Sequence, residues 1–268
     1  MDGMRDKTYY EQEATEEEFL AWYKQKEEQA YEKPSLTVDN VMFAYDKEAD
    51  ALKILLIQRK AHPCKDCWAL PGGFVSPNES TDDTCLRETE EETSLILSKD
   101  YIEQLYTFST PGRDPRTWVV TCSYMTFLPT FPQTTAADDA ADAKWFTVEM
   151  NELNDIRLTM PESDVYYYDF GKGWNPKNDF RLAFDHAAII RKAMERIKNK
   201  LAYEPNILRV LGESFTLGDA RKIYAKFLGI QPEGIDNSNF RKTHAHLFEE
   251  LGTQAEKPGR PSKTYRLK

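Results

Sequence analysis

The sequence is poor in the features that mark secreted and membrane proteins. Four cysteines in 268 residues are too few for the disulfide framework of a small secreted domain. No stretch approaches the 18 or more apolar residues that a membrane-spanning helix needs. The N-terminal sequence is acidic and lacks the pattern of a signal peptide. We therefore expect a cytoplasmic protein without a membrane partner, and its length is comfortable for two domains.

Positive charge is scarce in the first two thirds of the chain and abundant in the last third. Residues 1–180 carry 18 Lys and Arg against 35 Asp and Glu, a net charge of −17. Residues 181–268 carry 17 against 10, a net charge of +7, which the overall charge of −10 conceals. This asymmetry is expected when a module for a small molecule is joined to a module for nucleic acid.

Acidic side chains are concentrated in residues 73–95, whose sequence is GFVSPNESTDDTCLRETEEETSL. A helix over about residues 79–93 would place Glu88, Glu91 and Glu92 on one face. Like charges at this spacing repel, and a divalent cation would remove the repulsion because hard cations bind carboxylate oxygens. A solvated acidic face is the alternative explanation of such a run. The specific spacing from glycine to the last glutamate favours a metal site.

That spacing resembles the Nudix box, which has a glycine, a glutamate and an Arg-Glu-x-x-Glu-Glu core at fixed separations. The matching positions are Gly73, Glu79, Arg87, Glu88, Glu91, Glu92 and Leu95. Two positions depart from the pattern, because Thr89 stands where an aliphatic residue is usual and Ser94 where glycine is usual. Ser94 must therefore end the helix at a position that glycine fills at lower conformational cost.

The resemblance implies an α/β fold, namely a Nudix α/β/α sandwich with a mixed sheet. It also implies hydrolysis of a nucleoside diphosphate linked to another moiety, with Mg²⁺ or Mn²⁺ held by Glu88, Glu91 and Glu92. Glu79 would bond Arg87 or reach a further metal ion, and Arg87 would orient the glutamates. Candidates for a general base outside the box are Asp138, Asp139 and Asp142.

Two further segments look like the ADP-ribose-directed branch of the family. They are residues 68–75 (WALPGGFV) and residues 111–116 (PGRDPR). Arginine suits phosphate and carboxylate groups, although a surface salt bridge is an equally reasonable role for each one here. The candidate substrate-binding residues are Arg59, Gly72, Gly73, Arg113 and Arg116.

Hydrophobic periodicity suggests four regions. Residues 1–34 form a helical extension with a helix at 15–32, and residues 35–178 form the Nudix domain. Its strands are expected at 36–45, 52–58, 117–127 and 143–148, with a loop region at 150–178. Residues 179–204 form a connecting helix, with an apolar stripe over about 179–201. Residues 205–268 form a winged-helix-like domain.

The last region reads as two helices followed by a basic tail. We expect helices at 216–228, capped by Thr216 and Asp219 and stopped by Gly229, and at 237–251, stopped by Gly252. Helix, turn, helix and a basic Gly/Pro hairpin is the outline of a winged helix. A small helical cap with a solvated tail is the alternative.

Residues 215–217 (FTL), 239–242 (NFRK) and 259–266 (GRPSKTYR) resemble the winged-helix half of the Nudix-related transcriptional regulators of NAD metabolism. Those regulators bind ADP-ribose or a relative, and bind double-stranded DNA as homodimers. The implied DNA-binding residues are Arg241, Lys242 and His246 on the second helix and Arg260, Lys263 and Arg266 on the wing.

Residues 62–67 (HPCKDC) contain a Cys-x-x-Cys pair next to a histidine. Such a pair can bind zinc, but no second pair is present to complete four ligands. We expect a reduced structural loop.

Two functions follow from these patterns. The first is a Mg²⁺-dependent hydrolase that splits ADP-ribose into AMP and ribose 5-phosphate. The alternative is an ADP-ribose-responsive, DNA-binding regulator of NAD metabolism that uses the same pocket. The two are compatible, because regulation requires only that a ligand bind two domain arrangements with different affinity.

Overall fold

The computed structural model describes residues 6–26, 32–132, 140–160, 163–169, 180–254 and 262–268, and it separates residues 1–34 from residues 35–268 as two compact units. The first unit holds α1 (Lys7–Gln12) and α2 (Glu16–Lys26). Thr15 caps the start of α2, since its hydroxyl accepts a hydrogen bond from the Glu18 amide at 3.3 Å. The rings of Tyr10 and Trp22 stack at 4.7 Å and join the two helices. In the described residues no helix is long and apolar enough to cross a membrane.

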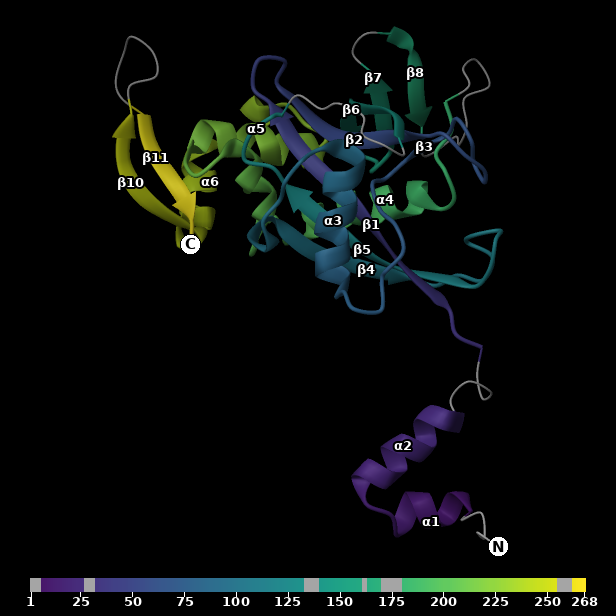
Figure 1. Ribbon diagram of the computed structural model, residues 1–268. Helices are drawn as coiled ribbons and strands as arrows, with labels where there is room; N and C mark the ends of the chain where they lie inside the picture. Colours follow the sequence, from purple (N-terminus) through teal and green to yellow (C-terminus); the bar gives the residue numbers. More distant parts are fainter. Residues whose placement is uncertain (1–5, 27–31, 133–139, 161–162, 170–179, 255–261) are drawn as a thin grey trace, which may run out of the picture. The chain divides into compact units, whose positions relative to one another are not determined.

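The second unit is built on an eight-stranded mixed sheet in the order β4-β5-β1-β2-β6-β7-β8, with β3 paired to β2 (Figure 1). Strands β1 and β5 are parallel, and the other pairs are antiparallel. The strands are β1 (Ser35–Asp46), β2 (Ala51–Arg59), β3 (Trp68–Ala69), β4 (Ile102–Phe108), β5 (Val119–Phe127), β6 (Ala140–Met150), β7 (Ile156–Met160) and β8 (Ser163–Asp169).

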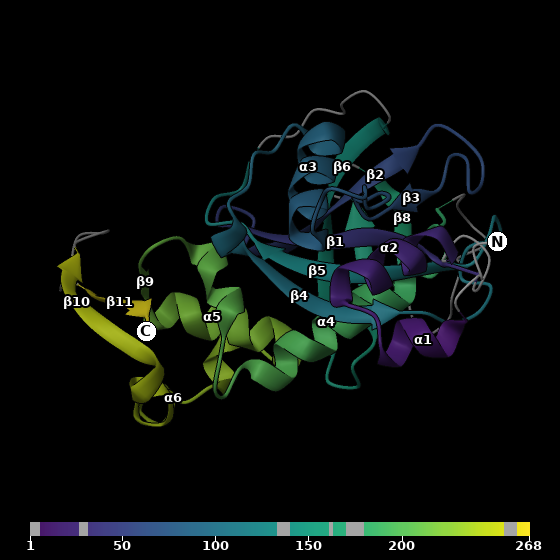
Figure 2. The same cartoon turned by 60° about the horizontal axis from the view of Figure 1, so that its bottom comes forward.

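Both faces of this sheet are covered. Along β1, Val41 and Phe43 contribute to one apolar cluster, while Met42 and Ala44 contribute to another, as the two-residue period of a strand requires. Helices α3 (Thr81–Thr93) and α4 (His186–Lys200) lie on opposite sides of the sheet (Figure 2). The α/β/α sandwich with a mixed sheet is therefore confirmed.

The C-terminal elements build a second, three-stranded sheet in the order β10-β11-β9. They are β9 (Phe215–Thr216), α5 (Leu217–Leu228), α6 (Asn237–His244), β10 (Phe248–Gln254) and β11 (Ser262–Leu267). The predicted capping box of α5 is present, and Gly229 ends the helix with a φ of 70°. One apolar core runs from the large sheet through α4 to Phe227 and Phe240, so the winged helix packs continuously with its neighbour.

The structure differs from the prediction at several segments. Residues 150–178 were expected to be a loop but contain β7 and β8, because Ile156, Leu158 and Met160 alternate into the core. The helix expected from 179 begins at His186, since Phe184 has a left-handed φ of 47° that no helix accommodates. Strand β4 was not anticipated.

The helix expected at 237–251 ends at His244, and β10 begins at Phe248. Phe248 is buried, and pairing between β10 and β11 rather than a helix places it there. Gly252 does not stop a helix. It lies beside an irregularity in this ladder with a φ of 147°.

Candidate functional site

Helix α3 carries the box and begins one residue after Ser80, which forms a capping box with Asp83. The structure accommodates Thr89 and Ser94, the two residues that depart from the Nudix pattern. The Thr89 hydroxyl is buried and accepts a hydrogen bond from the Asn40 side chain at 3.1 Å, and the Asn40 carbonyl oxygen accepts from Thr126 at 2.9 Å. Ser94 ends the helix in the left-handed region at φ 60°, and its amide donates to the carbonyl of Glu90.

Arg87 is the centre of the charged cluster on this helix. Its Nε donates to Glu79 Oε1 at 2.8 Å, and its guanidinium also donates to Glu88 at 2.8 Å and Glu91 at 2.9 Å. The hydrogen bond from Arg87 lowers the pKa of Glu79. Of the two roles expected for Glu79, the bond to Arg87 is the one seen, and Arg87 contacts two of the three glutamates that it was expected to orient.

Two adjacent glycines hold Glu88 and Glu92. The Gly72 amide donates to Glu92 Oε2 at 2.8 Å. A Cβ on Gly73 would lie 2.3 Å from the Glu88 carboxyl carbon, so only glycine leaves that carboxylate in place. Gly72 itself has a φ of 156°, and a Cβ there would lie 2.0 Å from the Val38 carbonyl oxygen. Burial raises the pKa of Glu92 to about 8 and also raises the pKa of Glu88.

These carboxylates suit a hard cation, because each offers oxygen ligands and burial penalises the charged form of both. Glu91 differs, since its side chain is 57% exposed and turns to Arg87. Among the described residues no cluster of three or more His, Cys, Asp or Glu side chains forms a ready metal site. The pair that fits a metal ion is thus Glu88 and Glu92, with Glu91 at a distance.

Glu88 and Glu92 line a cleft of about 480 Å³. The same cleft is lined by all of the candidate substrate-binding residues, namely Arg59, Gly72, Gly73, Arg113 and Arg116. The cleft also has lining residues that were not named as candidates, among them Asp39, Phe74, Asp114, Phe184 and His186. The topology brings these groups together from segments up to about 150 residues apart, which no local pattern reveals.

The three arginines of the cleft have different environments. Arg113 is only 5% exposed and makes a two-pronged ion pair with Asp185, with N–O distances of 2.7 and 2.9 Å. Arg116 is 42% exposed and is paired with Asp114 at 2.7 Å. Arg59 lies at the end of β2, where its guanidinium carbon is 5.1 Å from the centre of the Phe184 ring. Arg59 and Arg116 are therefore the arginines placed to meet a ligand, whereas Arg113 is committed to a buried pair.

His186 is a buried polar group on the wall of the cleft. Its Nδ1 accepts the Leu70 amide at 2.8 Å, and its Nε2 lies 3.4 Å from Asp39 Oδ1. Burial lowers the pKa of His186, so the ring is neutral and its proton sits on Nε2, facing Asp39. His186 falls within residues 179–201, where an apolar stripe was predicted. Its polar side chain was the only feature of the sequence there that indicated a place in the cleft.

Of the three candidates for a general base, the structure describes only Asp142. Asp138 and Asp139 lie outside the described residues. Asp142 is on β6, where it pairs with Lys144 at 2.8 Å, and it is not among the residues that line the cleft. Asp39 is a carboxylate of the cleft that lies outside the box.

The candidate DNA-binding residues are divided between α6 and the hairpin. Arg241 and Lys242 are exposed on α6, and His246 is exposed just beyond its end. On the hairpin, Lys263 pairs with Glu250 at 2.7 Å and Arg266 with Glu249 at 2.9 Å. Both hairpin cations are thus partly neutralised. Arg260 lies outside the described residues.

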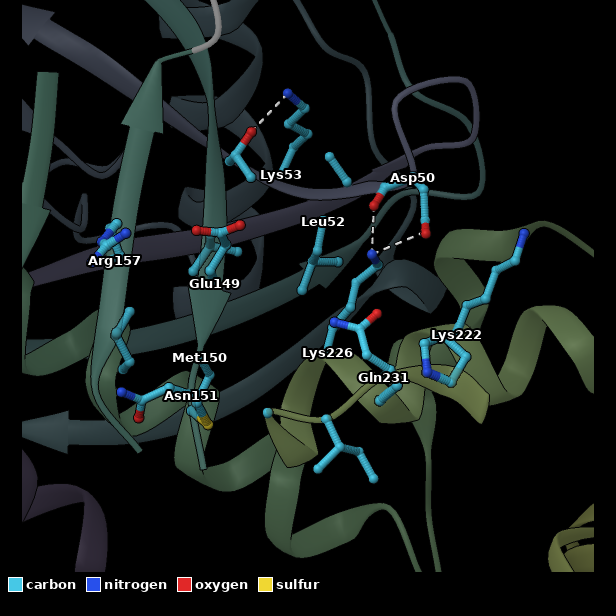
Figure 3. Close-up of a pocket in the computed structure, with 18 of the residues that line it drawn as sticks. Asp50, Leu52, Lys53, Glu149, Met150, Asn151, Arg157, Lys222, Lys226 and Gln231 are labelled. Carbon is cyan, nitrogen blue, oxygen red and sulfur yellow. Dashed lines mark hydrogen bonds and ion pairs between the residues drawn. The ribbon is translucent and has the colours of Figure 1, made fainter. Parts of the chain in front are cut away.

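A larger hollow of about 1020 Å³ lies between β2, β6 and the C-terminal end of α5 (Figure 3). Lys226 of α5 crosses it to pair with Asp50 at 2.9 Å. At one end, a Cβ on Gly229 would lie 2.3 Å from the Glu152 amide nitrogen, so α5 closes tightly on the turn after β6. No residue of the box lines this hollow, and its lining marks the seam between the winged helix and the large sheet.

Comparison with known proteins agrees with this geometry. Residues 33–167 match the NUDIX domain, and residues 207–267 match the NrtR DNA-binding winged helix domain. The chain belongs to the Nudix family. Nudix hydrolases generally use divalent metal ions.

Two relatives share different parts of the chain. The ADPR responsive transcriptional repressor NtrR of Acinetobacter baylyi is 28% identical over 256 residues, which cover 95% of this chain and 89% of the repressor. The ADP-ribose pyrophosphatase of Methanocaldococcus jannaschii is 35% identical over 174 residues, covering 65% of this chain and 80% of that enzyme. The similarity to the repressor extends through the winged helix.

Two crystal structures are similar over most of this Nudix chain. The MutT/nudix family protein from Enterococcus faecalis is 49% identical with a TM-score of 0.87, covering 99% of this chain and 100% of that one. Shewanella oneidensis NrtR, complexed with a 27mer DNA, is 32% identical with a TM-score of 0.62, covering 87% and 93%.

Proposed function

We propose that this chain binds ADP-ribose in the cleft and hydrolyses it to AMP and ribose 5-phosphate with Mg²⁺ or Mn²⁺. The observation that carries the proposal is that Glu88 and Glu92 line the same cleft as Arg59 and Arg116. Carboxylates for a cation and arginines for phosphates are the two groups that a diphosphate substrate requires. The ADP-ribose pyrophosphatase of M. jannaschii supports the choice of substrate.

Each residue has a defined task in this proposal. Glu88 and Glu92 hold the cation, and Glu91 reaches it or supports Arg87. A cation held by these residues would neutralise the diphosphate and lower the pKa of a water molecule. The Gly72 amide fixes the orientation of Glu92, and Gly73 leaves the space that Glu88 occupies. Arg59 and Arg116 bind the diphosphate, while Phe74 and Phe184 supply apolar walls.

The test is release of AMP from ADP-ribose with Mg²⁺, comparing the wild type with Glu92→Gln. Glu90→Gln is the matched control, because Glu90 is exposed on the same helix and does not line the cleft. We expect turnover in the wild type and the control, and a loss of about a hundredfold or more in Glu92→Gln, since the cation loses a charged ligand. Absence of AMP in all three proteins overturns the enzymatic proposal.

The second candidate function is control of DNA binding by ADP-ribose. It is favoured by the winged helix of residues 207–267 and by similarity to the A. baylyi repressor through both domains. In this proposal residues 35–178 bind the ligand, residues 179–204 connect, and residues 205–268 bind double-stranded DNA. The protein acts as a homodimer, with Arg241 and Lys242 of α6 at the DNA and Lys263 and Arg266 on the wing.

The test is binding of full-length protein to duplex DNA from upstream of its own gene, over a range of salt concentrations. Neutralised phosphates release counterions, so affinity falls with salt. Replacing Arg241 and Lys242 by alanine should weaken binding and lower the salt slope by about 0.9 for each phosphate that is no longer neutralised. Lys47→Ala, in the turn after β1, is the control. If the protein does not bind this DNA at low salt, either with or without ADP-ribose, the regulatory proposal is overturned.

A further inference from the structure

We propose that Cys64 and Cys67 are a redox modification site, which closes into an intramolecular disulfide and thereby alters the Arg59 side of the cleft. The two cysteines lie between β2 and β3, and neither belongs to the charged cluster of the box. The disulfide itself is independent of the proposed function. Its effect on ADP-ribose rests on that function.

The backbone already holds the two cysteines at the separation that a disulfide needs. The Cys67 amide donates to the Cys64 carbonyl at 3.1 Å, which closes a four-residue turn, and the two thiols are in hydrogen-bond contact. The Cα atoms at the ends of such a turn are less than about 7 Å apart, and disulfides span about 4.4–6.8 Å. Cys64 and Asp66 have φ values of 57° and 63°, so the turn is defined by two left-handed residues.

Hydrogen bonds tie this turn to Arg59. The Arg59 amide donates to the Cys67 carbonyl at 3.0 Å, and the Asp66 amide donates to the Arg59 carbonyl at 2.9 Å. The Arg59 guanidinium in turn donates to the carbonyl of Pro63 at 2.9 Å, next to Cys64. A change in the backbone at Cys64 is therefore transmitted to a side chain that lines the cleft.

The apolar surroundings of the two cysteines also connect them to the Arg59 side of the cleft. Cys64, Cys67 and Phe184 pack against one cluster, and the Arg59 guanidinium lies over the Phe184 ring. Burial raises the pKa of the Cys67 thiol, and the nearby Arg181 and Arg59 offset only part of this rise. The other two cysteines, Cys85 on α3 and Cys122 on β5, are buried in one apolar cluster.

The partner is a low-molecular-weight disulfide of the glutathione type. The thiolate of one cysteine attacks it, forms a mixed disulfide and releases one small thiol. The thiolate of the other cysteine then attacks the protein sulfur of that mixed disulfide and releases the second small thiol. The turn has lost two hydrogen atoms, and the small disulfide has been reduced to two thiols. Two thiols cannot supply the four ligands of a structural zinc site, so redox chemistry is the better use of this pair.

Closing the bond brings the sulfurs from hydrogen-bond contact to about 2.05 Å and tightens the turn. The Pro63 carbonyl then moves, and Arg59 loses the hydrogen-bond acceptor that fixes the direction of its side chain. We expect the oxidised protein to bind ADP-ribose about fivefold or more weakly than the reduced protein, and dithiothreitol to restore the affinity.

The experiment equilibrates full-length protein with mixtures of reduced and oxidised glutathione, counts free thiols and measures ADP-ribose affinity by calorimetry. The expected count falls from four to two, with peptide mapping to Cys64 and Cys67. The double variant Cys64→Ser/Cys67→Ser, which has no thiol in this turn, should keep one affinity across all mixtures. Cys85→Ala, which leaves the pair intact, should respond like the wild type, and its thermal melt shows that it is folded.

Retention of four thiols, or mixed disulfides that never close, overturns the modification site. A closed disulfide with unchanged affinity overturns its coupling to the cleft. Failure of the reduced wild type to bind ADP-ribose contradicts the proposed function instead, while the thiol count still decides whether the disulfide forms.

Discussion

The carboxylate of Glu88 lies against the Cα of Gly73, so that a methyl group at residue 73 would come within 2.3 Å of its carboxyl carbon. This contact joins the first residue of the box to the helix that follows it. The fixed spacing of the motif thus has a physical reason in this chain, because Gly73 leaves the space that the Glu88 carboxylate occupies.

Gly73→Ala is expected to displace Glu88 and to lower kcat/KM for ADP-ribose about tenfold or more, because small displacements of catalytic groups have large effects on rate. The apparent affinity for Mg²⁺ should fall in parallel, as a Mg²⁺ titration of turnover will show. Gly234→Ala is the control, since its Cβ would meet only a side-chain atom of Ile230, at 3.7 Å. Equal activity of the two variants would contradict the role of this contact.

Thr89→Val, which introduces the aliphatic type of residue usual in the box, is expected to destabilise the protein. It leaves the buried Asn40 amide without the acceptor that it has at 3.1 Å. An unsatisfied buried polar group costs about 1–3 kcal/mol, and urea denaturation measures this loss. A double-mutant cycle with Asn40→Val should show that the two effects are far from additive. Additivity would mean that the hydrogen bond contributes nothing.

Ser94→Gly is expected to stabilise the protein by about 0.5 kcal/mol. Ser94 is held at φ 60°, where an L-residue is disfavoured by roughly 1–2 kcal/mol, and glycine is not. Part of this gain is lost because glycine gives the unfolded chain more freedom. The urea midpoint should rise with an unchanged slope, whereas a lower midpoint would show that the Ser94 side chain stabilises the end of α3.

His186 is expected to make stability depend on pH below its ordinary pKa of 6.5. Burial lowers the pKa in the folded state, so below pH 6.5 the unfolded chain binds a proton that the folded protein does not. The free energy of unfolding therefore falls with decreasing pH, by up to about 1.4 kcal/mol per pH unit for one proton. Protonation of Glu92, whose pKa is raised to about 8, acts in the opposite sense over the same range. The slope of His186 is therefore the difference between the wild type and His186→Gln, with unfolding of both measured from pH 7.5 to 5.5.

Local signals predicted local structure well. The cap of α5 by Thr216 and Asp219, its end at Gly229 and the strand around residues 36–45 each depend on neighbours in sequence. Phe248 shows the limit, because its spacing from Phe240 fits a helix but pairing with β11 determines its conformation. A short apolar pattern cannot distinguish these outcomes when a partner strand is remote in sequence.

The same limit applies to the cleft. The box identified Glu88 and Glu92, because helical spacing places them together without help from the rest of the fold. His186 and Phe184 reach the same cleft from more than 90 residues away, through the pairing of Trp68 with Leu182. Arg113 was a candidate for ligand binding with a salt bridge as the alternative role, and only the fold reveals that Asp185, which is remote in sequence, pairs with it.

Asp185 is the residue immediately before α4, and α4 leads toward the winged helix. The ion pair between Arg113 and Asp185 therefore joins the cleft to the start of this helix. A ligand that competes with Asp185 for Arg113 changes the free energy of the helix start as well as its own binding. Linkage makes the exchange mutual: whatever shifts the helix start must change the affinity of the cleft by the same factor.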